Sequence, residues 1–237
     1  MTDPAADLVL RPAEVADADV VVDIHLAARR EAEMPPLSHP AEEVRNWLGG
    51  RVEGSIDEVW LAEVRGAPAG YARVSDHWLS DLYVAPRHHR HGVGTALLDL
   101  VKARRPDGFC LWVFEMNTPA RAFYEGHGLV ELERTDGYGN EEKSPDIRMA
   151  WPGGDPLGFF RRLIDDVDAE LGDLLARRVA LTRAAQTPKD APGRDPVREA
   201  EIAVTMAARA PELGAERLAR IMDAIITESL DATGGSS

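Results

Sequence analysis

The sequence is nearly without cysteine, which limits the chemistry open to it. Cys110 is the single cysteine among 237 residues, so an internal disulfide framework and a site built from thiolate metal ligands are both excluded. Because Cys110 stands within the apolar run FCLWVF, we expect it to be a small core residue.

Long apolar runs and an excess of basic residues are missing as well. No stretch approaches the roughly 18 apolar residues of a membrane-spanning helix, and the opening MTDPAADLVLR lacks the basic flank and apolar stretch of a signal peptide. The formal net charge of −14 argues against nucleic acid or an anionic membrane as the main partner. We therefore expect a cytoplasmic protein that holds any anionic ligand with a local group of cations.

The sequence does contain two segments of different pattern. Hydrophobic residues make up 44% of it, which is ample for real cores at this length. The stretch Pro152–Pro156 places two glycines between prolines, and strand signals stop beyond it. We therefore expect a first domain at 1–151, a linker at 152–156, a helical domain at 157–232 and a disordered tail at 233–237.

Apolar periodicity and turn residues predict the elements of both segments. Strands are expected at 8–11, 58–64, 69–74, around Leu82 and Val84, and at 109–114, 129–135 and 146–151. Helices are expected at 13–33, 41–48, 95–104, 118–126, 159–186, 196–210 and 215–230. Gly49 and Gly50 should end the second helix, and Thr118 should cap the fourth. Because the apolar strand at 109–114 follows a helix, a parallel βαβ step is expected.

The stretch Leu79–Arg105 joins a short strand, a turn with glycines and basic residues, and a helix. The first N–H groups of a helix have no internal partner and together carry roughly half a positive charge. Gly92 and Gly94 let the backbone approach an anion closely, while Arg87 and Arg90 add positive charge. The turn either binds phosphate or is an ordinary connection that binds nothing.

Three histidines, His88, His89 and His91, stand in the same turn. A metal site needs ligands that converge, and no cysteine pair or carboxylate is in register with them. We therefore expect no metal and interpret the three rings as polar, partly solvated parts of the turn.

Two motifs in this half match a known family. The pattern Arg or Gln, two residues, Gly, one residue, Gly or Ala falls on His89–Gly94, with His89 in the first place. The second motif lies in Val113–Asn117 and continues through Ala120, Phe123, Tyr124, Gly126, His127, Gly128 and Leu129. Residues 8–151 therefore resemble a GNAT-family acetyltransferase, which implies an α+β GNAT fold, a mixed, mostly antiparallel twisted sheet with flanking helices.

The resemblance also implies how acetyl-CoA would bind as co-substrate. The pyrophosphate would lie on the amides of Arg90 to Thr95, and the pantetheine would run between the strands that end near Val84 and Phe114. The implied cofactor-binding residues are Leu82, Val84, His89, Arg90, His91, Gly92, Val93, Gly94, Thr95 and Asn117. Tyr124 would be catalytic and protonate the departing thiolate, the alternative being a packed aromatic side chain.

The resemblance does not identify the general base or the acceptor amine. The position that often carries Glu in the family falls on Trp78, and the nearest carboxylates are Asp81 and Glu115. Each of these is either the base or a solvated strand-end residue, with ordered water as a further alternative. The polar connection before the last strand is either part of a pocket for a cationic acceptor or a charged hairpin; its residues are Tyr138, Asn140, Glu141 and Glu142.

In the helical segment, Arg178 stands on the continuation of an apolar stripe, between Leu174 and Leu181. A half-buried arginine requires an anion. Arg161 points roughly 100° away from Arg178 on the same helix, so one chain cannot easily direct both arginines at one ligand, whereas a partner chain can. We therefore expect an all-α three-helix domain that forms an intertwined homodimer.

Residues 159–233 resemble the all-helical type of chorismate mutase, on the motifs Phe160–Asp168, Leu174–Arg178, Asp195–Glu199 and Ile225–Ser229. The implied substrate-binding residues are Arg161 of the partner chain, Arg178, Lys189, Asp195, Arg198, Glu199 and Ser229. The resemblance implies that the arginines bind carboxylates, that Lys189 acts on the ether oxygen and that Asp195 or Glu199 holds the ring hydroxyl. Arg178, Lys189 and Glu199 would be the catalytic residues, without a cofactor, and the family's last partner of the ether oxygen falls on Thr233.

Together the two resemblances imply a bifunctional enzyme with small-molecule substrates. It would combine an acetyl-CoA-dependent N-acetyltransferase on an unknown amine with a chorismate mutase that forms prephenate, or with a close variant that acts on amino-substituted chorismate. A lyase that acts on isochorismate would use much the same arginines. The fusion motivates the hypothesis of one pathway, such as aromatic amino acid biosynthesis. The alternative is an acetyltransferase whose helical domain is a non-catalytic dimerisation or ligand-sensing module.

Overall fold

A computed structural model describes residues 8–54, 56–186 and 194–234. The chain forms two compact units, Met1–Phe160 and Arg161–Ser237, which we call unit 1 and unit 2 and describe separately. The domain boundaries drawn from the sequence stay predictions. Of the expected tail, positions 235–237 lie outside the described residues, whereas Thr233 belongs to the last helix.

Unit 1 contains a seven-stranded sheet in the order β1-β2-β3-β4-β5-β7-β6. The strands are β1 (Leu8–Pro12), β2 (Glu58–Val64), β3 (Ala67–Ser75), β4 (Trp78–Val84), β5 (Phe109–Phe114), β6 (Val130–Thr135) and β7 (Asp146–Trp151). Neighbouring strands are antiparallel except for β4 and β5, which are parallel. The mixed, mostly antiparallel sheet and the parallel step are therefore confirmed.

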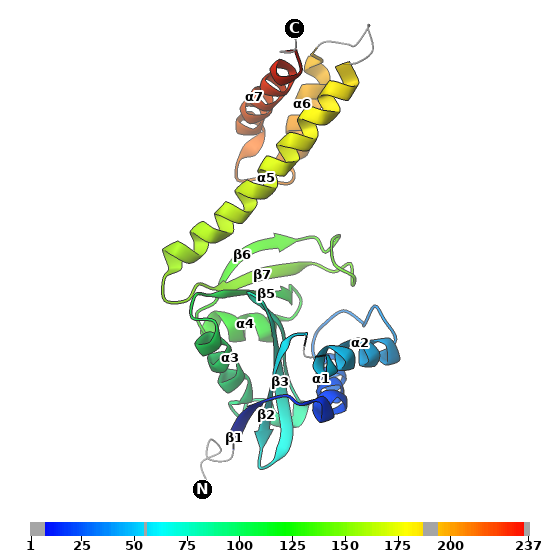
Figure 1. Ribbon diagram of the computed structural model, residues 1–237, viewed down its shortest axis with the longest axis vertical. Helices are drawn as coiled ribbons and strands as arrows, with labels where there is room; N and C mark the ends of the chain where they lie inside the picture. Colours follow the sequence, from blue (N-terminus) through cyan, green and yellow to red (C-terminus); the bar gives the residue numbers. More distant parts are fainter. Residues whose placement is uncertain (1–7, 55, 187–193, 235–237) are drawn as a thin grey trace. The chain divides into compact units, whose positions relative to one another are not determined.

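Helices cover both faces of this sheet, with α3 and α4 on one face and α1 and α2 on the other (Figure 1). The helices are α1 (Ala18–Glu31), α2 (Ala41–Glu53), α3 (Val93–Arg104) and α4 (Thr118–Gly126), and short 3-10 turns lie at η2 (Val15–Asp17) and η3 (Pro86–His88). Each face has its own apolar core. Leu97, Leu98 and Val101 of α3 pack on one side, and Val21 and Val22 of α1 on the other.

Three local expectations are wrong. Helix α2 does not end at Gly49 and Gly50, because Leu48 and Val52, one turn apart, are both buried and hold the helix through the glycines to Glu53. The cap of α4 is Asn117 rather than Thr118, since Asn117 Oδ1 accepts a hydrogen bond from Ala120 N at 3.2 Å. The helix expected at 13–33 begins only at Ala18, after the η2 turn.

The parallel pair β4 and β5 separates after its first residues. Its register is limited to Trp78 opposite Cys110, where Cys110 N also donates to His77 O at 2.9 Å. Beyond this point the two strands run on to Val84 and Phe114 without a paired residue between them. The facing main-chain groups of the two strands are therefore available to a ligand.

The described residues of unit 2 form helices, as expected. They are α5 (Pro156–Gln186, whose first turn belongs to unit 1), α6 (Pro196–Ala207) and α7 (Gly214–Gly234); α6 ends three residues before the expected position 210, and α7 extends four residues beyond 230. Helices α6 and α7 pack against each other. No helix in the described part of the chain is long and apolar enough to cross a membrane.

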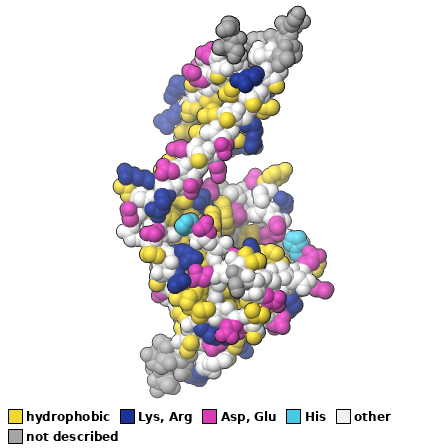
Figure 2. All heavy atoms as spheres, in the orientation of Figure 1, with side chains coloured by type: hydrophobic (Ala, Val, Ile, Leu, Met, Phe, Trp, Pro, Cys, Tyr) yellow, Lys and Arg dark blue, Asp and Glu magenta, His cyan; other side chains and the backbone are white. Residues whose placement is uncertain are grey.

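Apolar side chains of unit 2 remain on its surface (Figure 2). On α5 the exposed ones follow each other at helical spacing, namely Ile164, Val167, Leu171, Leu174 and Leu181. Each of them has about half or more of its surface exposed, and Leu181 reaches 66%. A single copy of unit 2 thus leaves the apolar stripe of its longest helix largely uncovered.

Candidate active sites

Unit 1 contains a cavity of about 930 Å³. Its walls come from α1, α2 and the connection between them, from β4 and the second half of β5, from α4 and from the connection between β6 and β7. Several residues singled out in the sequence lie on these walls, namely Asp81, Leu82, Asn117, Tyr124, Asn140, Glu141 and Glu142. The separation of β4 from β5 opens on this cavity, because Leu82 and Phe114 are among its lining residues.

Tyr124 is one of the buried groups of the cavity wall, with 8% of its surface exposed. Burial raises its pKa far above the usual value of a tyrosine, and the nearby Tyr83 and Asp81 add to the effect. The hydroxyl therefore stays protonated at neutral pH and is able to donate a proton. The alternative of a packed aromatic side chain is compatible with its burial, so its catalytic role stays a prediction.

At the rim of the cavity, ion pairs join the connection between β6 and β7 to α1 and to the connection between α1 and α2. Arg29 Nη2 of α1 lies 3.1 Å from Glu142 Oε1, and its guanidinium lies over the ring of Phe114. His39 stands between two carboxylates, 3.0 Å from Glu43 and 3.3 Å from Glu141, and its hydrogen bond to Glu43 is the main reason that its pKa is raised. The connection between β6 and β7, which contains Glu141 and Glu142, thus contributes to the cavity wall and is not merely a solvated hairpin.

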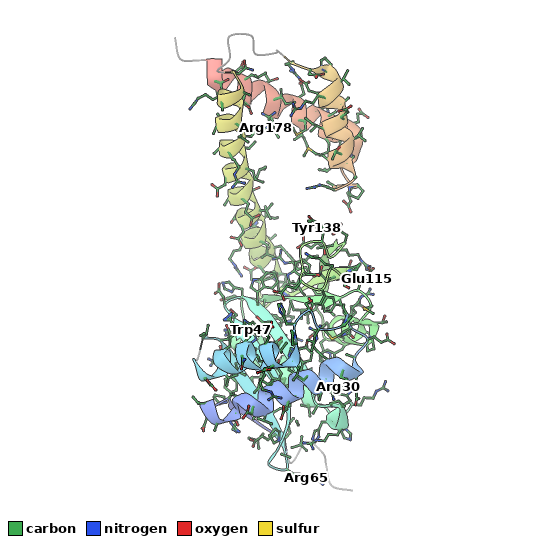
Figure 3. All side chains as sticks on the ribbon, turned by 90° about the vertical axis from the view of Figure 1, so that its right-hand side faces the viewer. Arg30, Trp47, Arg65, Glu115, Tyr138 and Arg178 are labelled. Atoms are coloured by element: carbon green, nitrogen blue, oxygen red, sulfur yellow. The ribbon has the colours of Figure 1, made fainter. Side chains whose placement is uncertain are left out.

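Tyr138 and Glu115, both labelled in Figure 3, are not among the residues that line the cavity. Tyr138 is 82% exposed, and Glu115 lies 2.6 Å from Arg134 in a surface ion pair. Trp78, at the family's position for Glu, stacks in parallel on Trp112 with ring centroids 6.4 Å apart. None of the three is placed to take a proton in this cavity.

Asp81 is buried, so the interpretation as a solvated strand-end residue is wrong. Its Oδ2 accepts from Arg73 Nε at 2.5 Å, and Arg73 Nη1 donates to Asp57 at 2.8 Å. Burial raises the pKa of the Tyr71 hydroxyl, and the charge of the nearby Asp81 carboxylate adds to the effect. Cross-strand pairing places Asp81 opposite Arg73 on β3, which brings this charge pair into the sheet.

Sequence reasoning missed His25, Tyr71 and Tyr83. His25 Nδ1 lies 2.8 Å from the Tyr71 hydroxyl, and its ring meets that of Tyr83 edge-on at 4.6 Å. His25 and Tyr83 line the cavity. One signal was present in the sequence, since His25 stands on the buried face of a predicted helix, one turn after Val21 and Val22.

The turn before α3 has the backbone expected of an anion-binding turn. Gly92 is the N-cap of α3 with φ of 81°, and no atom lies within 4 Å of the position its Cβ would take. No side chain caps the helix, so its first N–H groups are available. Arg90, with φ of 60°, precedes it. The residues present therefore fit a pyrophosphate group.

The side chains of this turn are engaged locally. His89 Nε2 lies 3.0 Å from Val84 O, His91 Nδ1 lies 2.7 Å from His89 O, and Thr95 Oγ1 lies 3.1 Å from His127 Nε2. Because these side chains already have partners, we expect the turn to contact a cofactor through its main-chain groups. The described residues contain no group of three or more His, Cys, Asp or Glu side chains that could hold a metal ion.

Unit 2 brings together two residues of its predicted site. Arg178 of α5 (Figure 3) donates from Nη1 to Ile225 O at 3.3 Å, and Ser229 of α7 donates from Oγ to the same oxygen at 2.5 Å. Arg161 and Arg198 are exposed, and Lys189 lies outside the described residues. Thr233 Oγ1 donates to Leu230 O at 2.7 Å.

The remaining predicted residues lie at the start of α6. Asp195 caps this helix and accepts from the main-chain N–H groups of positions 197 and 198, each at 3.1 Å. Glu199 is held by Arg194, whose Nη2 lies 2.6 Å from Glu199 Oε2 and also pairs with Asp223. The hydrogen bond from Arg194 lowers the pKa of Glu199. Arg194 has no counterpart in the motif and was not predicted.

Comparisons with known proteins agree with this division. Residues 55–131 match the family model "Acetyltransferase (GNAT) domain", and residues 160–233 match "Chorismate mutase type II". The chain joins a GNAT acetyltransferase domain to a chorismate mutase type II domain. Both are families of enzymes.

The chain spans less than two thirds of the length of each of the two curated relatives described next. It is 31% identical over 94 residues to the peptidyl-lysine N-acetyltransferase YiaC of Escherichia coli, across 39% of this chain and 62% of that protein. It is 36% identical over 75 residues to the probable N-acetyltransferase Rv2775 of Mycobacterium tuberculosis, across 28% and 43%. The Ard1 structure from Thermoplasma volcanium has the same fold, with a TM-score of 0.50 and 19% identity over 63% of this chain and 99% of that one.

Proposed function

We propose that unit 1 transfers an acetyl group from acetyl-CoA to a primary amine. The observation that carries this proposal is the separation of β4 from β5 after Trp78 and Cys110, which opens on the cavity lined by Tyr124. Acetyl-CoA, when bound, supplies an activated acetyl group as a thioester. The main chain from Arg90 to Thr95 would hold its pyrophosphate, and the unpaired edges of β4 and β5 would hold its extended arm.

The side chains of the cavity then have two tasks. Tyr124 gives its hydroxyl proton to the sulfur as the carbon–sulfur bond breaks, and the cavity walls hold the amine in position for attack on the acetyl carbon. Asn117 supports this site mainly by capping α4, which fixes the helix that carries Tyr124. Asp81 acts through Arg73 and Tyr71, because both contacts engage its carboxylate.

The acceptor is a primary amine, and a lysine side chain in a peptide is the first to test, because YiaC is named as a peptidyl-lysine N-acetyltransferase. The full chain would be mixed with acetyl-CoA and a short lysine peptide, and CoA thiol release would be followed together with the mass of the peptide. Acetylated peptide supports the proposal. Binding of acetyl-CoA without transfer to this peptide or to a panel of aliphatic and aromatic primary amines contradicts it.

We infer that unit 2 acts as a chorismate mutase, or on a close relative of chorismate, as a homodimer. The convergence of Arg178 and Ser229 on one main-chain oxygen supports a site between α5 and α7. The exposed arginine Arg161 and the uncovered apolar stripe of α5 support a partner copy that completes it. Loss of chorismate absorbance with the wild type, and none with Arg178→Ala, tests this activity.

A binding module is the second candidate for unit 2. It is favoured by Arg194, which pairs with Glu199 and Asp223 and so withholds Glu199 from a ring hydroxyl. Under this alternative chorismate is bound but not consumed. Calorimetric titration with chorismate, run beside the absorbance assay, separates the two candidates.

A further inference from the structure

We propose that His25 is the general base of the acetyl transfer and that Tyr71 and Asp81 position it. This inference rests on the acetyltransferase function proposed for unit 1. Neither the motifs nor the family's usual base position pointed to α1, whereas the cavity and the contacts of His25 with Tyr71 and Tyr83 do.

His25 is buried, with 6% of its surface exposed, yet its ring is part of the cavity wall. Helix α1 carries it on the face that packs on β3 and β4. The edge-on contact with Tyr83 and the bond to Tyr71 fix the ring from two neighbouring strands. A buried imidazole that faces a cavity is held in one orientation, which a proton acceptor requires.

The hydrogen-bond chain determines which ring nitrogen carries the proton. The negative charge of the Asp81 carboxylate acts on the Tyr71 hydroxyl, and because a carboxylate can only accept, it favours the orientation in which the hydroxyl proton points toward Asp81. The Tyr71 oxygen is then the acceptor for His25 Nδ1, at 2.8 Å. Nδ1 therefore bears the hydrogen, and Nε2 has a free lone pair. Among the described residues the ring has its hydrogen bond at Nδ1 alone, which leaves Nε2 to the cavity.

The charges around His25 favour its neutral form. Burial lowers its pKa below the usual value, the Asp81 carboxylate opposes this, and the guanidinium groups of Arg29 and Arg73 lower it further. These groups come from α1, β3 and β4, together with the protonated hydroxyls of Tyr71 and Tyr83, whose pKa values burial raises. An imidazole that is neutral at pH 7 is able to accept a proton there.

Other titratable groups of the cavity are less suited to this role. Glu142 is paired with Arg29, and Asp81 is engaged by Arg73 and Tyr71. His39 lies at the rim between two carboxylates that raise its pKa and favour its protonated form. His25 combines burial, a fixed tautomer and contact with the cavity.

In the proposed step the acceptor nitrogen gives up two protons, one to His25 and one to Tyr124. The acceptor enters as an ammonium ion, and His25 Nε2 takes one of its protons, which later leaves for solvent. The freed nitrogen forms a bond to the acetyl carbon while the carbon–sulfur bond breaks and Tyr124 gives its proton to the sulfur. A second proton from the nitrogen restores the Tyr124 hydroxyl. The products are the amide, CoA thiol and one proton released to solvent.

The test compares His25→Gln with His77→Gln, an exposed histidine outside the cavity lining whose loss should leave the pH profile unchanged. Initial rates of CoA release with acetyl-CoA and the lysine peptide would be measured from about pH 6 to about pH 10. For His25→Gln we expect kcat/KM to fall about 100-fold at pH 7 and to rise with unit slope toward the pKa of the amine, where the loss shrinks. A parallel profile, lowered equally at every pH, overturns the proposal.

A measurement on the wild type keeps the proposal falsifiable if the variant does not fold. The ¹⁵N chemical shifts of His25 in the full chain, without substrate, report its tautomer directly. We expect hydrogen on Nδ1 above the pKa, and the Tyr71→Phe variant should lose this preference and about 10-fold in kcat while KM for acetyl-CoA is kept. Hydrogen on Nε2 in the wild type overturns the assignment. An active wild type with this result leaves the acetyltransferase function intact, whereas an inactive wild type rejects both.

Discussion

Arg178 and Ser229 both donate to the main-chain oxygen of Ile225, Arg178 from Nη1 at 3.3 Å and Ser229 from Oγ at 2.5 Å. They belong to different helices, α5 and α7, and the family resemblance placed both in one site. Their convergence on a single carbonyl fixes the guanidinium without an anionic partner at this contact. Under the proposed mutase function, the other guanidinium donors of Arg178 would pair with a carboxylate of the substrate.

This geometry predicts that Arg178→Lys will not preserve activity. Lysine keeps the charge but cannot pair in two parallel bonds with a carboxylate, so we expect chorismate consumption to fall roughly 100-fold. The neighbouring Arg177, which is exposed, provides the control, and Arg177→Lys should keep the wild-type rate. Equal rates for both variants, followed by the absorbance of chorismate, would contradict the assigned role of Arg178.

Tyr124 gives a second prediction, for unit 1. Because burial keeps its hydroxyl protonated, Tyr124→Phe removes the proton donor while it retains the packed ring. We expect kcat for acetyl transfer to fall about 100-fold with little change in the affinity for acetyl-CoA. Tyr138→Phe removes a hydroxyl from a residue that is 82% exposed and should leave kcat unchanged. An unaltered kcat in Tyr124→Phe would support its role as a packing residue only.

The anion-binding turn is tested by two glycines with the same backbone constraint. Gly92 and Gly66 have φ of 81° and 72°, and at neither glycine does an atom lie within 4 Å of the position that a Cβ would take. Alanine at either site should therefore cost about 1 kcal/mol in the free energy of unfolding. We expect acetyl-CoA to raise the melting temperature of Gly66→Ala as in the wild type and that of Gly92→Ala by less. Identical shifts in both variants would remove the turn from the binding site.

The sequence predicted best those elements whose signal is local. Strands β5 and β7 have the expected bounds, because β5 is a continuous apolar run, β7 is rich in apolar residues, and turn residues precede both strands. The two glycines of α2 misled the prediction, since the burial of Leu48 and Val52 depends on tertiary packing that a local rule does not contain. The same holds for the cap of α4, where Asn117 and Thr118 are equally good candidates on residue type alone.

The residues of the candidate site also fall into two groups, those that a sequence motif identifies and those that only tertiary packing brings together. Tyr124 and Asn117 were found because a motif carries them, and both line the cavity. His25, Tyr71 and Asp81 meet through the packing of α1 on two strands, and no spacing along the chain relates the positions of the three. Arg194 was missed for a different reason, since its partners Glu199 and Asp223 come together only when α6 packs on α7.

The apolar stripe of α5 gives the last prediction. Leu171 is 48% exposed in the single chain, and a partner copy would bury it, so Leu171→Glu should place a charge in the interface and shift the protein from dimer to monomer. Ala169→Glu adds the same charge about 200° around the helix and should leave the dimer intact. Sedimentation velocity of both variants and the wild type measures the outcome.

A wild type that sediments as a monomer, or two variants with the same mass as the wild type, would contradict the proposed interface. Because Arg161 is to reach the site of the partner copy, the monomeric variant should also lose chorismate consumption, whereas acetyl transfer by unit 1 should persist.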